Sequence, residues 1–196
     1  MKTFRAILDT DIGTDIDDTW ALGLVLKSPE LDLKLVTTAT FDTAYRAKIV
    51  ARMLEIAGRT DVPIGIGPSS SDKAGPQNPW VLDYDLQSYP GKVHHDGVSA
   101  LVDAIMSSSE PVTVITIGPL TNIAAALKRE PRIAARARIV AMLGSVRIGY
   151  GGKKGPTPEY NVVQDVPACQ AVLAAPWDIV LTPLDTCGTV VLDGQR

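Results

Sequence analysis

Five aspartates lie within ten residues near the start of the chain, in the segment DTDIGTDIDD. They are Asp9, Asp11, Asp15, Asp17 and Asp18. Carboxylates this close repel one another, and a strand-like apolar run at residues 4–8 leads directly into them. Carboxylate oxygens suit hard cations such as Ca²⁺ or Mg²⁺, so a bound cation would explain the cluster. A helix N-cap followed by a solvated acidic turn explains one or two of these aspartates, but not five.

Two known aspartate motifs fit this segment less well. A calcium-binding EF-hand loop needs Gly at its sixth position and Glu at its twelfth, but the sixth residue is Thr14 counted from Asp9 and Ile16 counted from Asp11. Haloacid-dehalogenase phosphatases carry D-x-D-x-T after the first strand. Asp9 and Asp11 match that motif, whereas Gly13 stands where Thr or Val belongs. The phosphatase interpretation stays open as the weaker alternative.

Short apolar runs alternate with helical patterns along the chain. We expect strands at 4–8, 33–40, 62–67, 112–118, 138–144 and 177–185, and helices at 17–28, 44–58, 98–108, 119–130 and 166–175. This alternation predicts an α/β fold with a mostly parallel sheet flanked by helices on both faces. Ligands of such sheets bind outside the carboxyl ends of the strands. The segment 68–97 is rich in Pro, Gly and Ser, which is typical of a functional lid or a disordered loop.

Three longer motifs follow one another in the order that one enzyme family uses. They are ILDTDIGTDIDDTWAL, VTVITIGPLTNIAAAL and TPEYNVVQDVPACQAVL. Together they resemble the signatures of the inosine–uridine-preferring nucleoside hydrolases and cover most of the chain. The resemblance implies a Rossmann-like fold in which residues 1–196 form a single domain, the N-terminal part of the family's full length. We therefore expect a chain truncated at its C-terminus, part of a longer protein and poorly active alone.

The same resemblance implies calcium-dependent hydrolysis of the N-glycosidic bond of ribonucleosides. In this family a carboxylate of the first loop binds the metal and activates water, and Asp11 matches it. Asp18 matches a further calcium ligand, and Ile117 matches a residue whose main-chain carbonyl binds calcium. Asp17 matches the aspartate that binds the ribose diol. Two extra residues before the helix leave Asp15 as a rival for that role.

Further substrate contacts follow from the resemblance. Glu159 and Asn161 match the pair that holds the ribose hydroxyls, with the capping of loop backbone groups as the alternative. Asp42 matches a ribose-proximal position, with a helix N-cap as the alternative. His95, which follows His94 in KVHHDG, matches a His-Gly segment near the active site, with a surface or capping histidine as the alternative.

Composition bounds the remaining expectations. The net charge is −3 and no Lys/Arg stripe is present, so nucleic-acid binding is not expected. No apolar stretch is long enough for a signal peptide or a membrane span. Cys169 and Cys187 belong to no CxxC or His-spaced motif, and we expect buried thiols in a reducing, cytoplasmic compartment.

The resemblance also implies an oligomeric state, a substrate and a biological role. It implies a homodimer or homotetramer that acts on a small-molecule ribonucleoside in purine and pyrimidine salvage. The alternative function is a nucleoside-binding or structural homologue that lacks catalysis.

Overall fold

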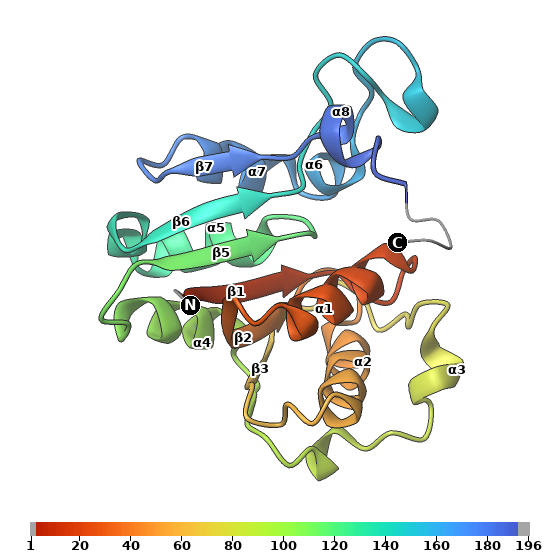
Figure 1. Cartoon of the computed structure of the whole chain (residues 1–196), viewed down its shortest axis with the longest axis vertical. Helices are drawn as coiled ribbons and strands as arrows, with labels where there is room; N and C mark the ends of the chain where they lie inside the picture. The colour runs from red at the N-terminus through yellow and green to blue at the C-terminus, as the bar shows by residue number, and fades with distance from the viewer. Residues whose placement is uncertain (1–2, 192–196) are drawn as a thin grey trace.

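The computed structural model describes residues 3–191, and within them seven strands form one sheet (Figure 1). The order is β4-β3-β2-β1-β5-β6-β7, and all neighbouring pairs are parallel. The strands are β1 (Phe4–Thr10), β2 (Leu31–Thr38), β3 (Ile64–Ile66), β4 (Val93–His94), β5 (Val112–Thr116), β6 (Ala137–Ala141) and β7 (Ile179–Leu181). The helices are α1 (Asp17–Lys27), α2 (Thr43–Ile56), α3 (Asn78–Val81), α4 (Gly97–Met106), α5 (Thr121–Arg129), α6 (Tyr160–Gln164), α7 (Val166–Leu173) and α8 (Leu184–Cys187). The predicted parallel α/β fold is confirmed.

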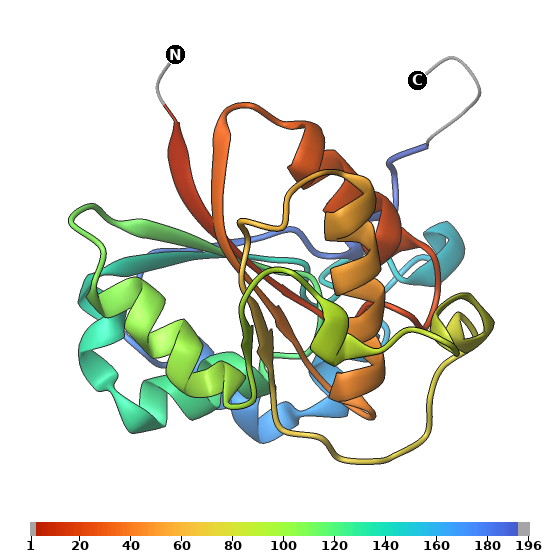
Figure 2. The same cartoon turned by 90° about the horizontal axis from the view of Figure 1, so that it is seen from below.

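Helices cover both faces of this sheet, and each set has its own core (Figure 2). α4, α5 and α7 pack on one face around residues such as Leu101, whereas α1 and α2 pack on the other around residues such as Leu54. β1 serves both cores because alternate residues of a strand point to opposite faces. Ile7 accordingly lies in the first core and Leu8 in the second. The central strand is therefore fixed on both sides.

β1 is also where the strand order changes direction. β2, β3 and β4 follow on one side of it, while β5, β6 and β7 lie on the other. The connections after β1 and β5 therefore diverge and leave a crevice at the carboxyl ends of these two strands. The acidic loop follows β1, and the GPLTN segment follows β5. Both motifs thus reach the place where ligands of such sheets usually bind.

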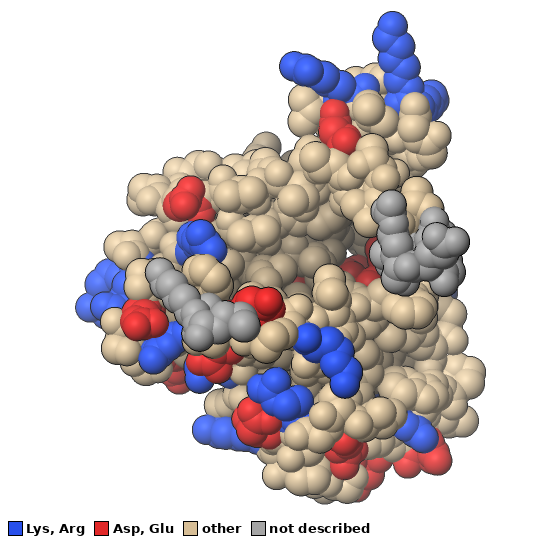
Figure 3. All heavy atoms as spheres, in the orientation of Figure 1, with Lys and Arg blue, Asp and Glu red and all other residues tan. Residues whose placement is uncertain are grey.

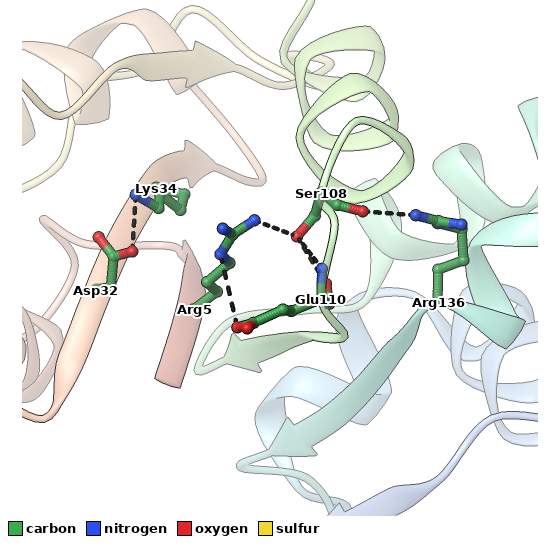
Figure 4. A network of polar contacts seen from close by, with 6 residues as sticks. All are labelled: Arg5, Asp32, Lys34, Ser108, Glu110 and Arg136. Carbon is green, nitrogen blue, oxygen red and sulfur yellow. Dashed lines mark hydrogen bonds and ion pairs between the residues drawn. The ribbon is translucent and has the colours of Figure 1, made fainter. Parts of the chain in front are cut away.

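The amino ends of the strands carry a different set of polar contacts (Figure 4). Arg5 of β1 donates to the Ser108 hydroxyl at 2.9 Å, and its side chain lies 4.0 Å from Glu110. Arg136 donates to the Ser108 carbonyl at 2.5 Å. Exposed ion pairs of this kind contribute roughly 0–1 kcal/mol each. This rim joins the β1, β5 and β6 strand starts, and it lies at the end of the sheet away from the acidic loop.

The segment 68–97 has short elements of its own, which differs from the disordered-loop alternative; its role as a functional lid stays a prediction. It contains α3, the short 3₁₀ turn Leu86–Ser88 and β4. Asp85 caps the 3₁₀ turn by accepting from the Gln87 amide. Tyr89 is buried and donates its hydroxyl to the Val62 carbonyl at 2.8 Å. Side-chain packing and local caps therefore give this Pro-rich segment a fixed path.

Two element boundaries differ from the predicted ones for reasons of backbone chemistry. The helix expected at 119–130 begins at Thr121, so Pro119 precedes the helix instead of occupying its first turn. The strand expected at 177–185 ends at Leu181. Pro183 has no N–H for the ladder, and α8 begins immediately after it. Of the two cysteines, Cys169 is buried as expected, but Cys187 is only partly buried.

Two other expectations concern the chain ends and membranes. The C-terminal truncation rests in part on residues 192–196, which lie outside the described residues. No helix in the described part of the chain is long and apolar enough to cross a membrane.

Two glycines provide a matched test of this packing. A Cβ at Gly97, the first residue of α4, would lie 2.7 Å from backbone atoms of Gly65 and Ile66, whereas a Cβ at Gly23 in α1 would meet nothing within 4 Å. Gly97→Ala should therefore lower the free energy of unfolding by roughly 1–3 kcal/mol. Gly23→Ala should raise it by about 0.5–1 kcal/mol through helix propensity. Urea unfolding measures both, and equal effects would contradict the close β3–α4 packing.

Candidate active site

The acidic loop turns sharply after β1, and a glycine makes this turn possible. Gly13 has a φ of +107°, and a Cβ there would lie 2.7 Å from Ile49 and 2.9 Å from Tyr45. The Tyr45 hydroxyl donates to the Gly13 carbonyl at 2.9 Å. The loop is thereby held closely against α2.

Asp11 and Asp18 are two buried carboxylates at the ends of this loop, and they lie close together. Both are more than nine-tenths buried, and each side chain affects the ionisation of the other. Thr10 also donates its hydroxyl to Asp18, which lies in the first turn of α1, where the helix dipole favours negative charge. Burial, followed by the neighbouring charge of Asp11, raises the pKa of Asp18 well above its usual range. Burial raises the pKa of Asp11 to about 6, although the nearby Arg46 charge opposes the rise.

The segment after β5 lies directly against Asp11. A Cβ at Gly118 would stand 2.9 Å from both the Asp11 amide nitrogen and its Oδ1. Ile117 donates its amide to the Asp9 carbonyl at 2.9 Å. The Ile117 carbonyl accepts from Asn161 Nδ2 at 3.0 Å, which leaves one of its two lone pairs available. The structure thus brings Asp11, Asp18, the Ile117 carbonyl and Asn161 to one end of β1 and β5.

Glu159 and Asn161 reach this site from the loop after β6, but both already have backbone partners. The Glu159 carboxylate accepts from the amides of Asn161 at 2.8 Å, Gly144 at 2.9 Å and Val162 at 3.2 Å. Asn161 Nδ2 also donates to the Met142 carbonyl at 3.1 Å. The structure therefore shows the backbone-capping role that was the alternative for this pair. Their contact with ribose hydroxyls stays a prediction.

Asp15 and Asp17 occupy the exposed side of the loop. Partial burial, followed by the neighbouring Asp15, raises the pKa of Asp17. Asp15 is held through its main-chain carbonyl, which accepts from Gln77 Nε2 at 2.7 Å. Both lie at exposed positions close enough for their charges to act on the buried Asp11 and Asp18, so the choice between them for the ribose diol stays open.

Asp42 and His95 are placed differently. Asp42 caps α2 by accepting from the Tyr45 amide at 2.9 Å, which is the alternative role expected for it. His94 belongs to β4, which lies three strands from β1, roughly 14 Å at about 4.8 Å per strand. His95 follows it in an exposed bend. No hydrogen bond within residues 3–191 joins either histidine to the acidic loop, so a role for His95 in the site stays a prediction.

A second polar layer beneath the site was not expected from the sequence. Asp9 is fully buried and accepts from Thr37 Oγ1 at 2.5 Å and Asn122 Nδ2 at 2.7 Å. Its other oxygen, Oδ2, has no hydrogen-bond partner within the described residues, nor have Asn122 Oδ1 and Thr116 Oγ1. Burial raises the pKa of Asp9 to about 7. The D-x-D spacing and the final Asn of GPLTN are the sequence signals that mark this layer.

The buried donors fit a hard cation. Figure 3 shows acidic side chains gathered in a recess at the end of the sheet toward which the strand arrows of Figure 1 point. Two buried carboxylates and a main-chain carbonyl are oxygen donors of the kind that calcium prefers. A cation would also neutralise the repulsion that raises the pKa of Asp18. Across residues 3–191, however, no group of three or more His, Cys, Asp or Glu side chains is arranged to hold a metal, so main-chain oxygens must contribute.

The fold and this site define a parallel α/β protein with a carboxylate centre at its topological switch point. Comparison with known proteins gives the family. The sequence model of the inosine-uridine preferring nucleoside hydrolases matches residues 6–196, and the chain belongs to this family.

Curated relatives and solved structures agree with that assignment. The chain is 31% identical to the non-specific ribonucleoside hydrolase RihC of Escherichia fergusonii, with 94% of this chain and 62% of that protein covered. It is 32% identical to the inosine-uridine preferring nucleoside hydrolase of Leishmania major, with 92% and 60% covered. A plant nucleoside hydrolase, PpNRh1, superposes with a TM-score of 0.79 at 26% identity, covering 98% of this chain and 63% of that one. The chain therefore spans about three fifths of the length of these relatives.

The raised pKa of Asp9 predicts how stability depends on pH in chelator-treated protein. A carboxyl group whose pKa rises on folding stabilises the fold below its unfolded pKa near 4, and this contribution is lost as pH rises through about 7. The shift corresponds to at most roughly 4 kcal/mol. Asp9→Asn keeps the shape without the charge, so the free energy of unfolding of the variant should rise relative to that of the native chain as the pH increases from 4.5 to 7.5. The exposed Asp83→Asn is the control in denaturant titrations. An unchanged difference between Asp9→Asn and the native chain across this range would contradict the prediction.

Proposed function

We propose that the protein hydrolyses the N-glycosidic bond of ribonucleosides to ribose and free base, with Asp11 as the general base. The observation that supports this most directly is the buried Asp11–Asp18 pair against the segment that follows β5, at the switch point of the sheet. Family membership supports the same reaction class. A cytoplasmic homo-oligomer that serves purine and pyrimidine salvage is part of this proposal.

The reaction needs a base, a nucleophilic water and an oriented sugar. The water oxygen bonds to the anomeric carbon while the carbon–nitrogen bond breaks, and the bonding electron pair leaves with the base. Asp11 accepts the proton that the water loses. A bound calcium ion held by Asp11, Asp18 and the Ile117 carbonyl would supply positive charge that lowers the pKa of the water.

The surrounding carboxylates suit the charge that develops on the sugar. Breaking an N-glycosidic bond creates an oxocarbenium-like ribose, which fixed negative charge stabilises. Asp17 and Asp15 stand on the open side of the loop, where a carboxylate can accept hydrogen bonds from the ribose diol. Asn161 binds the Ile117 carbonyl after β5, and Glu159 accepts from the Asn161 amide at the start of α6. No covalent intermediate is required, which agrees with the lack of a Ser or Cys nucleophile motif in the sequence.

Asp11→Asn tests the proposed base. Asparagine keeps the size and one oxygen but cannot take a proton, so the turnover of the complete enzyme should fall by roughly 10²–10⁴. Release of base from inosine and uridine, and of p-nitrophenol from its riboside, should be measured with and without chelator. Asp83→Asn should leave turnover unchanged. Turnover that survives Asp11→Asn would exclude Asp11 as the base, and nucleoside binding without turnover in the native protein would favour the non-catalytic alternative.

Asp15→Ala and Asp17→Ala decide which carboxylate binds the diol. We expect Asp17→Ala to raise KM more than it lowers kcat, because the diol is contacted before and during the reaction. Asp15→Ala should have the smaller effect. A comparison with the 2′-deoxynucleoside provides the control, since the variant that loses a diol contact should discriminate less between the two substrates. A larger effect of Asp15→Ala would assign the role to Asp15.

A further inference from the structure

Arg46 is a buried cation next to the acidic loop, and the proposed reaction does not use it. It lies near the start of α2 and is only 2% exposed. None of the ion pairs in the described part of the chain includes it. Burying an unpaired charge is unfavourable unless hydrogen bonds compensate it. The hydrogen bonds of this guanidinium therefore indicate the role of the buried charge.

The guanidinium binds the main chain of the acidic loop. Its Nη1 donates to the Asp11 carbonyl and, at 2.7 Å, to the Ile12 carbonyl. Nη1 and Nη2 both reach the Thr14 hydroxyl, at 3.2 and 3.1 Å. Three successive points of the loop between β1 and α1 thus converge on one rigid fork. A planar guanidinium has five donors in fixed directions, so these bonds fix the path of the loop as well as its position.

The same side chain also binds the turn between β2 and α2. Nε donates to the Thr40 carbonyl at 2.9 Å, and the Phe41 ring lies 5.9 Å from the guanidinium carbon. Thr40 and Phe41 have φ angles of 63° and 48°, a left-handed conformation that is unfavourable for a β-branched or bulky residue. Ser70 holds Phe41 from the other side through its amide and hydroxyl. The strained turn is therefore kept in place from two directions.

Electrostatics and geometry make opposite predictions for Arg46. A positive charge beside the Asp11–Asp18 pair lowers the pKa of Asp11, and it repels any second cation that enters. If charge compensation were its role, removing Arg46 would strengthen cation binding. If its role were to hold the loop, removal would weaken binding, since the two carboxylates would have to be ordered by the cation itself.

We infer that Arg46 is a positioning residue that ties the acidic loop to the Thr40–Phe41 turn and so assembles the Asp11–Asp18 pair before any cation or substrate binds. This inference takes the identity of the ligand from the proposed function. The clamp, by which we mean the contacts of Arg46 with the acidic loop and with the Thr40–Phe41 turn, does not depend on it. Its direct contacts are with loop carbonyls and hydroxyls, and it acts on Asp11 through the main chain that it holds. The specific geometry belongs to the guanidinium, and lysine would reproduce the charge without the fork.

The first test uses the metal-free chain and needs no activity. Arg46→Met removes the donors but keeps an apolar stem of similar length, and Arg52→Met makes the same change on α2, where the arginine instead contacts α3. Hydrogen–deuterium exchange should rise in peptides spanning residues 10–18 and 38–45 of Arg46→Met, but not in those of Arg52→Met. Exchange in β5 and α5 should stay low in both variants, which shows that the fold persists. Unchanged exchange in the acidic loop of a folded Arg46→Met would overturn the clamp.

The second test is calorimetric titration of calcium into the native chain and the variants. Loss of a residue that orients metal ligands typically weakens affinity by roughly 10–100-fold, and we expect this for Arg46→Met. Arg46→Lys should recover only part of the loss, whereas Arg52→Met should bind like the native chain. Calcium binding that becomes tighter in Arg46→Met, or full recovery by Arg46→Lys, would show that charge and not geometry is the role of Arg46.

A milder variant covers the case in which Arg46→Met does not fold. Thr14→Val removes only the hydroxyl that accepts from both Nη atoms, and it should raise exchange in the acidic loop and weaken calcium binding several-fold. Unchanged exchange in Thr14→Val would contradict the clamp. If the native chain binds no calcium, the proposed metal site fails, while the exchange experiment still decides the role of Arg46.

Discussion

Two carboxyl groups that lie close together inside a protein are the constraint on which this structure depends. Asp11 and Asp18 are both buried, and each affects the ionisation of the other. Each unit of raised pKa corresponds to about 1.4 kcal/mol of unfavourable ionisation, so the pair cannot carry two charges unless something compensates them. A shared proton, a bound cation and nearby dipoles are the available solutions. The structure around the pair provides the nearby dipoles. A shared proton or a bound cation can supply the remaining compensation.

Dipoles and donors converge on the pair because of where it lies in the sheet. Asp18 sits in the first turn of α1 and accepts from Thr10, while Asp11 lies against Gly118 after β5. Parallel strands bring all their carboxyl ends to one edge, and the reversal of strand order at β1 keeps a crevice open there. The loop can only approach β5 this closely because residue 118 lacks a side chain. The strand order that defines the fold therefore also determines where the site lies.

The sequence predicted the longer strands and helices well because their signals are local, whereas the short elements α3, β4, α6 and α8 were not predicted. Strand and helix periodicity placed β1, α1, β5 and α7 to within a few residues, and the fold class followed from their alternation. Boundaries were less predictable where caps decide them. The helix start at Thr121 and the strand end before Pro183 depend on backbone hydrogen bonds that residue types only partly indicate. The local order of segment 68–97 depends on side chains such as Tyr89 reaching distant carbonyls.

The candidate site was predictable only in part, because several of its contacts join residues far apart in sequence. Asp11 and Asp18 stand out by their spacing, but the bond from Asn122 to Asp9 spans 113 residues. Only the register of β1 against β2 and β5 places Thr37, Asp9 and Thr116 side by side. Arg46 is similarly hidden, since its helix position looks like that of any solvent-facing arginine until α2 is packed against the loop.

The layer around Asp9 explains how the site is tied to the core. Asn122 Nδ2 donates to Asp9 and, at 3.0 Å, to the Thr38 carbonyl at the end of β2, so α5, β1 and β2 are joined directly beneath the acidic loop. Arg46 joins the same two strand ends one layer higher, through Asp11 and Thr40. The Asn122 amide and the Arg46 guanidinium, both buried, thus bind the ends of β1 and β2 at two levels. A site held at two levels in this way orders the acidic loop without relying on a ligand, because moving the loop would break the hydrogen bonds that the buried Arg46 donates to its carbonyls.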